Sequence, residues 1–210
     1  MDEVALELYG NVPSLMIAPD AATTWKLEEL CPPGTGEIEV ELGFGRGHFL
    51  LGRAKTEAGI RFIGLETRRK WVHVASRRAE RQDIRNMRVY HADARDVLPR
   101  IEDSNVVNTV FINFPDPWWK KRQRKRTLIS PTLISQLHRL IMTGGTLFVQ
   151  TDVPDRADFY LSLLNAYEGF ENEHPDSDFI GENPFGTRTH REGKCIEDNI
   201  PVYRMLFRKV

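Results

Sequence analysis

The sequence predicts an α/β fold in which a mostly parallel sheet carries helices on both faces. Three observations support this prediction. Short apolar segments of five to eight residues recur along the chain, longer helical patterns separate them, and glycine or proline stands at many of the junctions. Repeated strand–helix units build parallel sheets, because each helix carries the chain back across the sheet.

The expected elements follow one another in a regular order. In the first half we expect strands at 37–42, 61–66 and 86–91, with helices of about ten residues from His48 and over 68–82. In the second half we expect a strand at 106–113, then a helix that is capped by Ser130-Pro131 and ends at Leu140. Gly144-Gly145 is expected to end the connection that leads to a strand at 146–150. A helix from Pro154 to about Ala166 follows, and then strands around 168–174 and 201–208. Phe148, Phe159 and Phe170 are expected in the core.

Composition limits the class of protein and its organisation. With 210 residues, 40% hydrophobic and 28% charged, the chain is typical of a globular protein, which excludes collagen, disordered tails and disulfide-rich toxins. We expect a short acidic segment over 1–36 packed on one domain over 37–210. The sequence shows no secretory signal and no apolar run long enough to span a membrane, so we expect a cytoplasmic protein. Its two cysteines are far apart and lack metal-ligand spacing, so we expect no metal site.

Charge is distributed unevenly along the chain. Residues 1–43 contain nine acids and one base, for a net −8, while the remainder carries +7. Six of the seven residues over 120–126 are basic, and a second basic set runs from Arg68 to Arg88. Such blocks indicate either a solvated face or a patch that binds phosphates.

The first expected strand ends in a glycine-rich turn, Glu41-Leu-Gly-Phe-Gly-Arg-Gly-His48. Glycines at alternate positions permit a tight turn and close approach of a ligand to the backbone. His48 stands where the dinucleotide fingerprint has its third glycine, which disfavours a pyrophosphate site and a nicotinamide oxidoreductase. The preceding Glu41 favours a ligand with a ribose and an ammonium or sulfonium group.

Acids also follow the next two strands. Glu66 lies 23 residues after Gly43, close to the spacing at which an acid accepts hydrogen bonds from a ribose diol. Asp93, after the third strand, is placed to meet the amino edge of an adenine. Ligands of such sheets bind at the carboxyl ends of the strands, so these acids predict one cofactor site.

The fourth strand leads into Phe114-Pro-Asp-Pro-Trp-Trp119 and then into the basic block. Two prolines stiffen the backbone and hold Asp116 at the mouth of the site. Trp118 and Trp119 offer planes for base stacking or pack in the core, and the block can contact phosphates. A nucleic acid substrate is therefore predicted.

These motifs together resemble the TrmB-type tRNA (guanine-N7-)-methyltransferases. The resemblance rests on ELGFGRG at 41–47, Glu66, ADA at 92–94, the string from Phe114 to Arg126, Thr151-Asp152, and the tail segments 189–192 and 202–204. It implies a Rossmann-like class I fold dependent on S-adenosylmethionine (SAM), with a seven-stranded, mostly parallel sheet. It also implies methylation of a guanine in the tRNA variable loop, at tRNA position 46.

The resemblance assigns roles to individual residues. The SAM site would comprise Glu41, Gly43, Gly45, Gly47, Glu66, Asp93, Ala94 and Asp116. Substrate contacts would come from Lys120, Asp152, Thr189, His190, Arg191 and Glu192. Contacts to tRNA phosphates are expected from Lys121, Arg122, Arg124, Lys125 and Arg126. Asp116 is the catalytic candidate, because a carboxylate near the base stabilises the charge that the guanine gains.

The chain departs from the family pattern at three places. His190-Arg191 lacks the aromatic residue usual in that tail motif, Trp119 doubles a tryptophan that is usually single, and the N-terminal segment lacks the basic residues that many members carry. We expect an enzyme that acts on tRNA without a partner subunit, as a monomer or a homodimer. The alternatives are a SAM enzyme that methylates an exocyclic amine, and a non-catalytic RNA-binding protein on the same fold.

Overall fold

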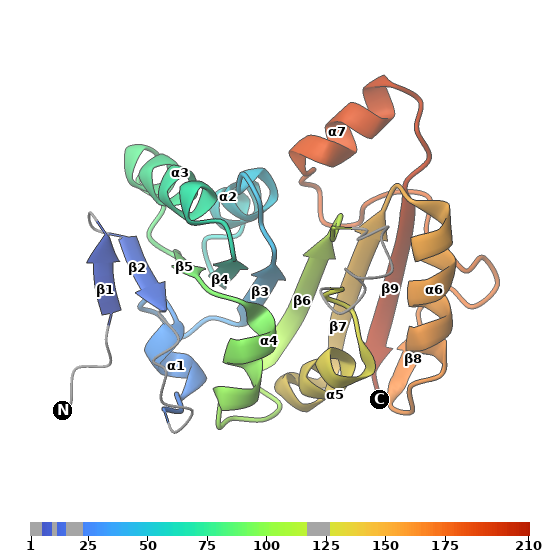
Figure 1. Cartoon of the computed structure of the whole chain (residues 1–210), viewed down its shortest axis with the longest axis horizontal. Helices are drawn as coiled ribbons and strands as arrows, with labels where there is room; N and C mark the ends of the chain where they lie inside the picture. Colours follow the sequence, from blue (N-terminus) through green and yellow to red (C-terminus); the bar gives the residue numbers. More distant parts are fainter. Residues whose placement is uncertain (1–5, 10–11, 16–22, 117–126) are drawn as a thin grey trace. The chain divides into compact units, whose positions relative to one another are not determined.

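The computed structural model of the chain describes residues 6–9, 12–15, 23–116 and 127–210. The chain forms two compact units, 1–103 and 104–210. The boundary expected between residues 36 and 37 stays a prediction. The first unit contains, in order, β1 (Leu6–Tyr9), β2 (Val12–Leu15), α1 (Leu27–Leu30), β3 (Ile38–Leu42), α2 (His48–Thr56), β4 (Arg61–Glu66), α3 (Arg69–Arg81), β5 (Met87–His91), α4 (Ala94–Val97) and the 3₁₀ helix η1 (Leu98–Arg100) (Figure 1).

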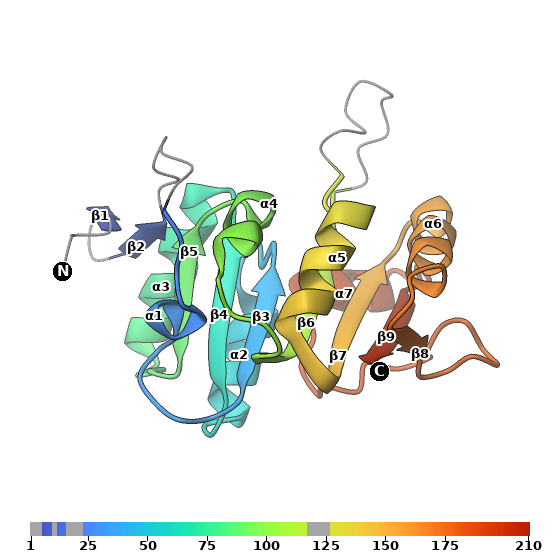
Figure 2. The same cartoon turned by 90° about the horizontal axis from the view of Figure 1, so that it is seen from below.

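The first unit is built on three parallel strands in the order β5-β4-β3, which lie side by side in Figure 2. Every residue of β3 and of β4 is buried. Strands covered on both faces show continuous rather than alternating burial, as expected of a parallel sheet. Strands β1 and β2 form a separate antiparallel hairpin.

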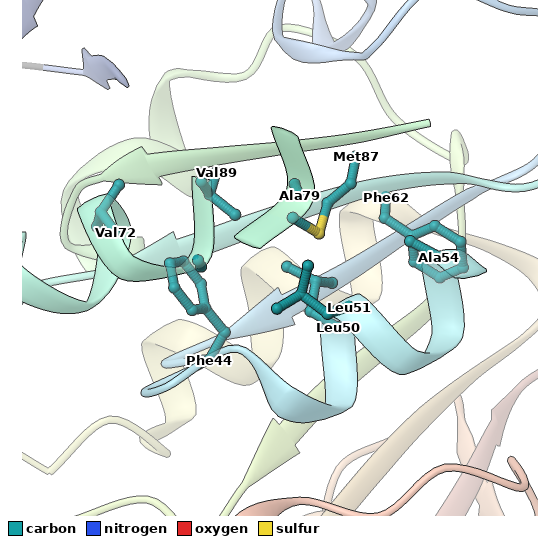
Figure 3. Close-up of a cluster of buried hydrophobic side chains, with 10 residues drawn as sticks. Phe44, Leu50, Leu51, Ala54, Phe62, Val72, Ala79, Met87 and Val89 are labelled. Carbon is teal, nitrogen blue, oxygen red and sulfur yellow. The ribbon is translucent and has the colours of Figure 1, made fainter. Parts of the chain in front are cut away.

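A hydrophobic cluster joins α2 and α3 to the strands of this unit (Figure 3). Phe44 and Leu50 pack there with Phe62 from β4 and Val89 from β5, and each is at most 5% exposed. Removing a buried leucine side chain from such a core costs about 2–5 kcal/mol. The cluster therefore fixes the start of α2, and with it the glycine-rich turn, against β4 and α3.

The second unit contains β6 (Val107–Asn113), α5 (Pro131–Leu140), β7 (Ile141–Thr151), α6 (Pro154–Asn165), β8 (Phe170–Asn172), α7 (His190–Glu197) and β9 (Tyr203–Lys209). Its strands lie in the order β6-β7-β9-β8, with β6 and β7 parallel and β9 antiparallel to both of its neighbours. With β3–β5 they make the seven-stranded, mostly parallel sheet that the sequence predicts. Ser130 caps α5 as expected, because its hydroxyl accepts a hydrogen bond from the Leu133 amide.

Three expectations were wrong or incomplete. Gly144-Gly145 does not precede the strand but lies within β7, opposite an irregularity between Val107 and Thr109 where the register shifts. A Cβ on Gly145 would lie 2.5 Å from the carbonyl oxygen of Asn108, so only glycine fits there. Phe159 is 45% exposed rather than in the core. Helix α7 was not predicted, because Gly193 weakens its helical pattern.

No helix within the described ranges is long and apolar enough to cross a lipid bilayer.

Candidate functional site

The glycine-rich turn after β3 leaves open space beside its backbone. Gly43 and Gly45 have φ values of +76° and +53°, a region that other residues rarely adopt. A Cβ on either residue would meet no atom of the described residues within 4 Å. The backbone therefore approaches a space that a ligand can fill. Gly47 has a different role, because its hydrogen faces α3 and a Cβ there would lie 2.9 Å from the Cβ of Ala75.

Glu66 joins the end of β4 to this turn. Its carboxylate is buried and accepts a 2.8 Å hydrogen bond from the Gly45 amide through Oε2, and another of 2.8 Å from the Arg68 amide through Oε1. The Thr67 hydroxyl donates a longer hydrogen bond of 3.4 Å to Oε1. A carboxylate has about four acceptor positions, so about one remains for a further hydroxyl group. Glu66 thus holds the glycine turn in shape and keeps an acceptor position for the predicted ribose.

Asp93 follows β5 and begins α4, whose first residue is the buried Ala94. The Asp93 carboxylate accepts a 2.9 Å hydrogen bond from the Arg95 amide and one of 3.0 Å from the Arg95 Nε. Partial burial disfavours the ionised form, but the hydrogen bonds from Arg95 outweigh it and hold the pKa of Asp93 below its ordinary value. The predicted adenine contact would share this carboxylate with Arg95.

The residues of the first unit fit the ribose and adenine parts of SAM. Glu41 is buried on β3, and Glu66 and Asp93 come at the carboxyl ends of the two strands that follow along the chain. Parallel strands present such residues along one edge, where open α/β sheets bind ligands. The open space at Gly43 and Gly45 adds room for the ligand beside the backbone.

In the second unit, the chain leaves β6 through a strained residue. Phe114 has a φ of +50°, which is a genuine outlier for a bulky side chain. Its amide donates a 2.8 Å hydrogen bond to the Gln150 carbonyl on β7, and Pro115 follows directly. Strain of this kind persists where the surroundings fix the backbone, and it clusters at functional sites. Asp116 lies two residues after Phe114, beyond the end of the strand, and is exposed.

Two of the predicted substrate residues contact each other. Asp152 follows β7 and its side chain is 13% exposed, whereas that of Arg191 on α7 is 53% exposed. The Arg191 Nε donates a 3.1 Å hydrogen bond to Asp152 Oδ2, and Nη2 contacts the same oxygen. The tail segment, at which the chain departs from the resemblance, is thus joined to the end of β7 by the ion pair between Arg191 and Asp152.

Glu192 forms the centre of a buried polar network. It is 0% exposed, and its Oε1 accepts hydrogen bonds of 2.9 and 3.2 Å from Nη2 and Nε of Arg204 on β9. With Thr189 it forms a capping box at the start of α7: the Glu192 amide donates to the Thr189 hydroxyl, and Glu192 Oε2 accepts from the Thr189 amide. The same carboxylate therefore caps α7 and binds it to β9.

The network continues to the ends of β6 and β7. Gln150 Nε2 donates a 2.8 Å hydrogen bond to Asn113 Oδ1 and one of 3.3 Å to Glu192 Oε2, while Asn183 Nδ2 donates to Glu192 Oε2 at 3.1 Å. Donors from four segments thus surround the Glu192 carboxylate. Direct contact of Thr189, His190, Arg191 and Glu192 with a substrate stays a prediction. Within the protein, Glu192 positions the helix that carries the exposed His190 and Arg191.

Sequence reasoning missed several partners of these residues. Arg95 stands two positions after Asp93 and could have been recognised as its partner from that spacing alone. The signal for Asn113 and Gln150 was a polar side chain at the last positions of otherwise apolar strands. Nothing in the sequence pointed to Asn183, which comes from an irregular segment.

Several predicted residues lie outside the described part of the chain. They are Trp118, Trp119, Lys120, Lys121, Arg122, Arg124, Lys125 and Arg126. Over the ranges that the structure covers, no group of three or more His, Cys, Asp or Glu side chains could hold a metal ion.

Comparison with known proteins identifies similar chains. A family model described as "Putative methyltransferase" matches residues 35–205. The tRNA (guanine-N(7)-)-methyltransferase of Myxococcus xanthus is 33% identical over 81% of this chain and 82% of its own. That of Thermosynechococcus vestitus is 32% identical over 82% of this chain and 80% of its own. A SAM-dependent O-methyltransferase from Thermotoga maritima is 14% identical with a TM-score of 0.54, covers 84% of this chain and 60% of its own, and shares the predicted Rossmann-like fold.

Proposed function

We propose that this chain, which belongs to the tRNA (guanine-N7-)-methyltransferase family, methylates N7 of the guanine at tRNA position 46, in the variable loop. The family membership supports the reaction and the use of SAM. One observation carries the proposal: at the carboxyl ends of the strands of the first unit, Glu66 binds the open glycine turn after β3, and Asp93 follows β5. The position within tRNA is the further step of the proposal.

The chemistry of the acceptor sets what the protein must do. Guanine N7 carries a free lone pair and no proton, so no general base is needed to form the nucleophile. SAM supplies a methyl group on a positively charged sulfur. The protein's task is therefore to hold N7 in line with that methyl group, at about 3 Å, and to accommodate the charge that moves onto the base.

Asp116 is the residue proposed for the second task. Its carboxylate can accept hydrogen bonds from the guanine N1–H and the exocyclic amine, which holds the base in register. Its negative charge stabilises the guanine as the ring becomes positive. The strained backbone at Phe114 and the following Pro115 support this role, because they fix the direction in which Asp116 leaves β6.

The acceptor base must leave its stack, which costs a few kcal/mol, so the tRNA needs further contacts. We assign phosphate contacts to the basic block 120–126 and substrate contacts to Lys120, Asp152 and the segment 189–192. Arg191 is able to exchange Asp152 for a phosphate, because more than half of its side chain is exposed. We further propose that the enzyme acts in the cytoplasm without a partner subunit or a metal, as a monomer or a homodimer.

The experiment uses labelled SAM and two transcripts of one tRNA, one with guanine at position 46 and one with adenine there. We expect label on the first transcript only, with chain cleavage at N7-methylguanine mapping to that nucleotide. Label on both transcripts, or cleavage at another guanine, would refute the assignment of the position. No label on either, together with measurable SAM binding, would refute a lone enzyme.

A further inference from the structure

Helix α3 carries a concentration of positive charge that the proposed reaction does not use. Five of its thirteen residues, Arg69, Lys70, Arg77, Arg78 and Arg81, are basic, and Glu80 is its one acid. Its first turn contains no acid at all. Basic residues in the first turn oppose the helix dipole by a few tenths of a kcal/mol each, so folding alone does not favour this sequence.

The charge lies on the face of α3 that points away from the core. Val72, Ala75 and Ala79 are the buried residues of the helix. Lys70, Arg77 and Arg81 are exposed, and their separations of seven and eleven residues place them within about 40° of one another around the helix axis. These three residues, the α3 basic stripe, extend over about 16 Å along the helix.

The stripe begins beside an aromatic side chain at the edge of the glycine turn. The Lys70 Nζ and the Arg46 guanidinium each lie 5.2 Å from the centre of the half-buried Trp71 ring. Arg78 Nη1 donates a 3.2 Å hydrogen bond to the Arg46 carbonyl, which links the helix to the turn. Cations beside an aromatic plane are a common arrangement where proteins bind nucleic acid strands.

The cations of the stripe form no ion pair with any of the described residues. No ion pair between residues of the described ranges includes Lys70, Arg77 or Arg81. Other exposed cations are paired, for example Arg85 with Asp83 and Arg208 with Glu173. Three aligned cations that form no ion pair, with Glu80 as the one acid of the helix, give a predominantly positive surface that is complementary to a polyanion.

We propose that the α3 basic stripe binds the phosphate backbone of tRNA, as a second contact surface in addition to block 120–126. The inference rests on the proposed function, which makes tRNA the polyanion available to the protein. It also supplies phosphate contacts in a chain whose first 43 residues carry a net charge of −8. A solvated helix face is the competing interpretation of the same charges.

The test compares two double variants with the same loss of charge. Arg77→Gln/Arg81→Gln removes two cations of the stripe, and glutamine retains a high helix propensity. The control, Lys55→Gln/Arg208→Gln, removes two exposed cations outside the proposed contacts. Binding of unmodified tRNA is measured between 0.05 and 0.4 M salt, together with the Kd for SAM and steady-state kinetics.

Each phosphate contact contributes about 0.7–0.9 to the slope of log affinity against log salt. We expect the stripe variant to lose about 1.5 from this slope and about 30-fold in tRNA affinity at 0.1 M salt. The KM for tRNA rises accordingly, while kcat at saturating tRNA and the Kd for SAM stay within about twofold. The control variant and the charge-conserving Arg77→Lys/Arg81→Lys retain the wild-type slope.

An unchanged slope in the stripe variant would overturn the proposal, as would an equal loss in the control. Loss of affinity in the Lys/Lys variant would overturn it too, because shape rather than charge would then be responsible. If the wild type methylates tRNA and the stripe variant binds tRNA normally, the proposed function stands and the stripe alone fails. If the wild type does not bind tRNA, both fail.

Discussion

Replacing Glu192 by glutamine removes the charge at the centre of the buried network while keeping the shape of the side chain. The side chains of Arg204 and Glu192 are only 8% and 1% exposed, so water cannot replace the lost carboxylate. The Arg204 guanidinium would then be buried without its counter-ion. Breaking one partner of a buried ion pair costs about 3–5 kcal/mol in the free energy of unfolding.

The double-mutant cycle separates this cost from simple loss of packing. Arg204→Met alone leaves the buried Glu192 carboxylate with neutral donors, namely the side chains of Gln150 and Asn183 and the Thr189 amide, so it should cost about as much. The double variant Glu192→Gln/Arg204→Met leaves no unpaired charge, and its cost should be clearly smaller than the sum of the two single costs.

The assay is urea unfolding, supported by thermal unfolding. For a chain of this length, the single variants should unfold about 6–20 °C lower than the wild type. The control is the exposed pair on the same helix, Lys194 and Glu197, whose side chains are 52% and 64% exposed. Removing that pair should change the free energy of unfolding by less than about 0.5 kcal/mol. Additive costs in the cycle, or a loss below about 1 kcal/mol for Glu192→Gln, would refute the reasoning.

Three further predictions concern the predicted site. Asp116→Asn should lower kcat about 10- to 100-fold, because the amide cannot stabilise the cationic guanine. Calorimetry should find the Kd for SAM nearly unchanged, and equal losses in kcat and SAM affinity would contradict a catalytic role for Asp116. Gly47→Ala should cost about 1–3 kcal/mol in urea, because φ is +74° and the new Cβ would lie 2.9 Å from that of Ala75; an unchanged midpoint would contradict this. Asp93 has a lowered pKa beside Arg95, so its ion pair should stabilise the fold above about pH 4, and this stabilisation should be lost as the pH falls through the pKa of the folded state. The difference in thermal midpoint between the wild type and Asp93→Asn should therefore shrink below about pH 4. A difference that grows as the pH falls would contradict the predicted direction of the pH dependence.

Much of the fold followed from local patterns in the sequence. The strand predicted over 61–66 is β4 to the residue, because a continuous apolar run ending in glutamate is typical of a buried parallel strand. Ser130 and Pro131 marked the start of α5 through capping chemistry that requires only neighbouring residues. Features set within a few residues were therefore predictable.

Features that depend on distant partners were not predictable. Helix α7 contains Gly193 and few apolar residues, and it is held by the capping box and by contact of Glu192 with Arg204, twelve residues away. At the register shift between β6 and β7, the backbone of Gly145 passes close to the carbonyl of Asn108, a contact that no local pattern records. For the candidate site, the sequence singled out Asp93 and Glu192, but it did not reveal Arg95 as the partner of Asp93 or Gln150 as a partner of Glu192.

The measurement that tests the central claim most directly replaces the acceptor atom itself. A tRNA assembled with 7-deazaguanine at position 46 keeps the Watson–Crick edge of guanine but has a C–H in place of N7. With labelled SAM, we expect full methylation of the guanine tRNA and none of the 7-deaza tRNA, while both bind with the same affinity. Label on the 7-deaza tRNA would contradict methylation at N7 of this guanine.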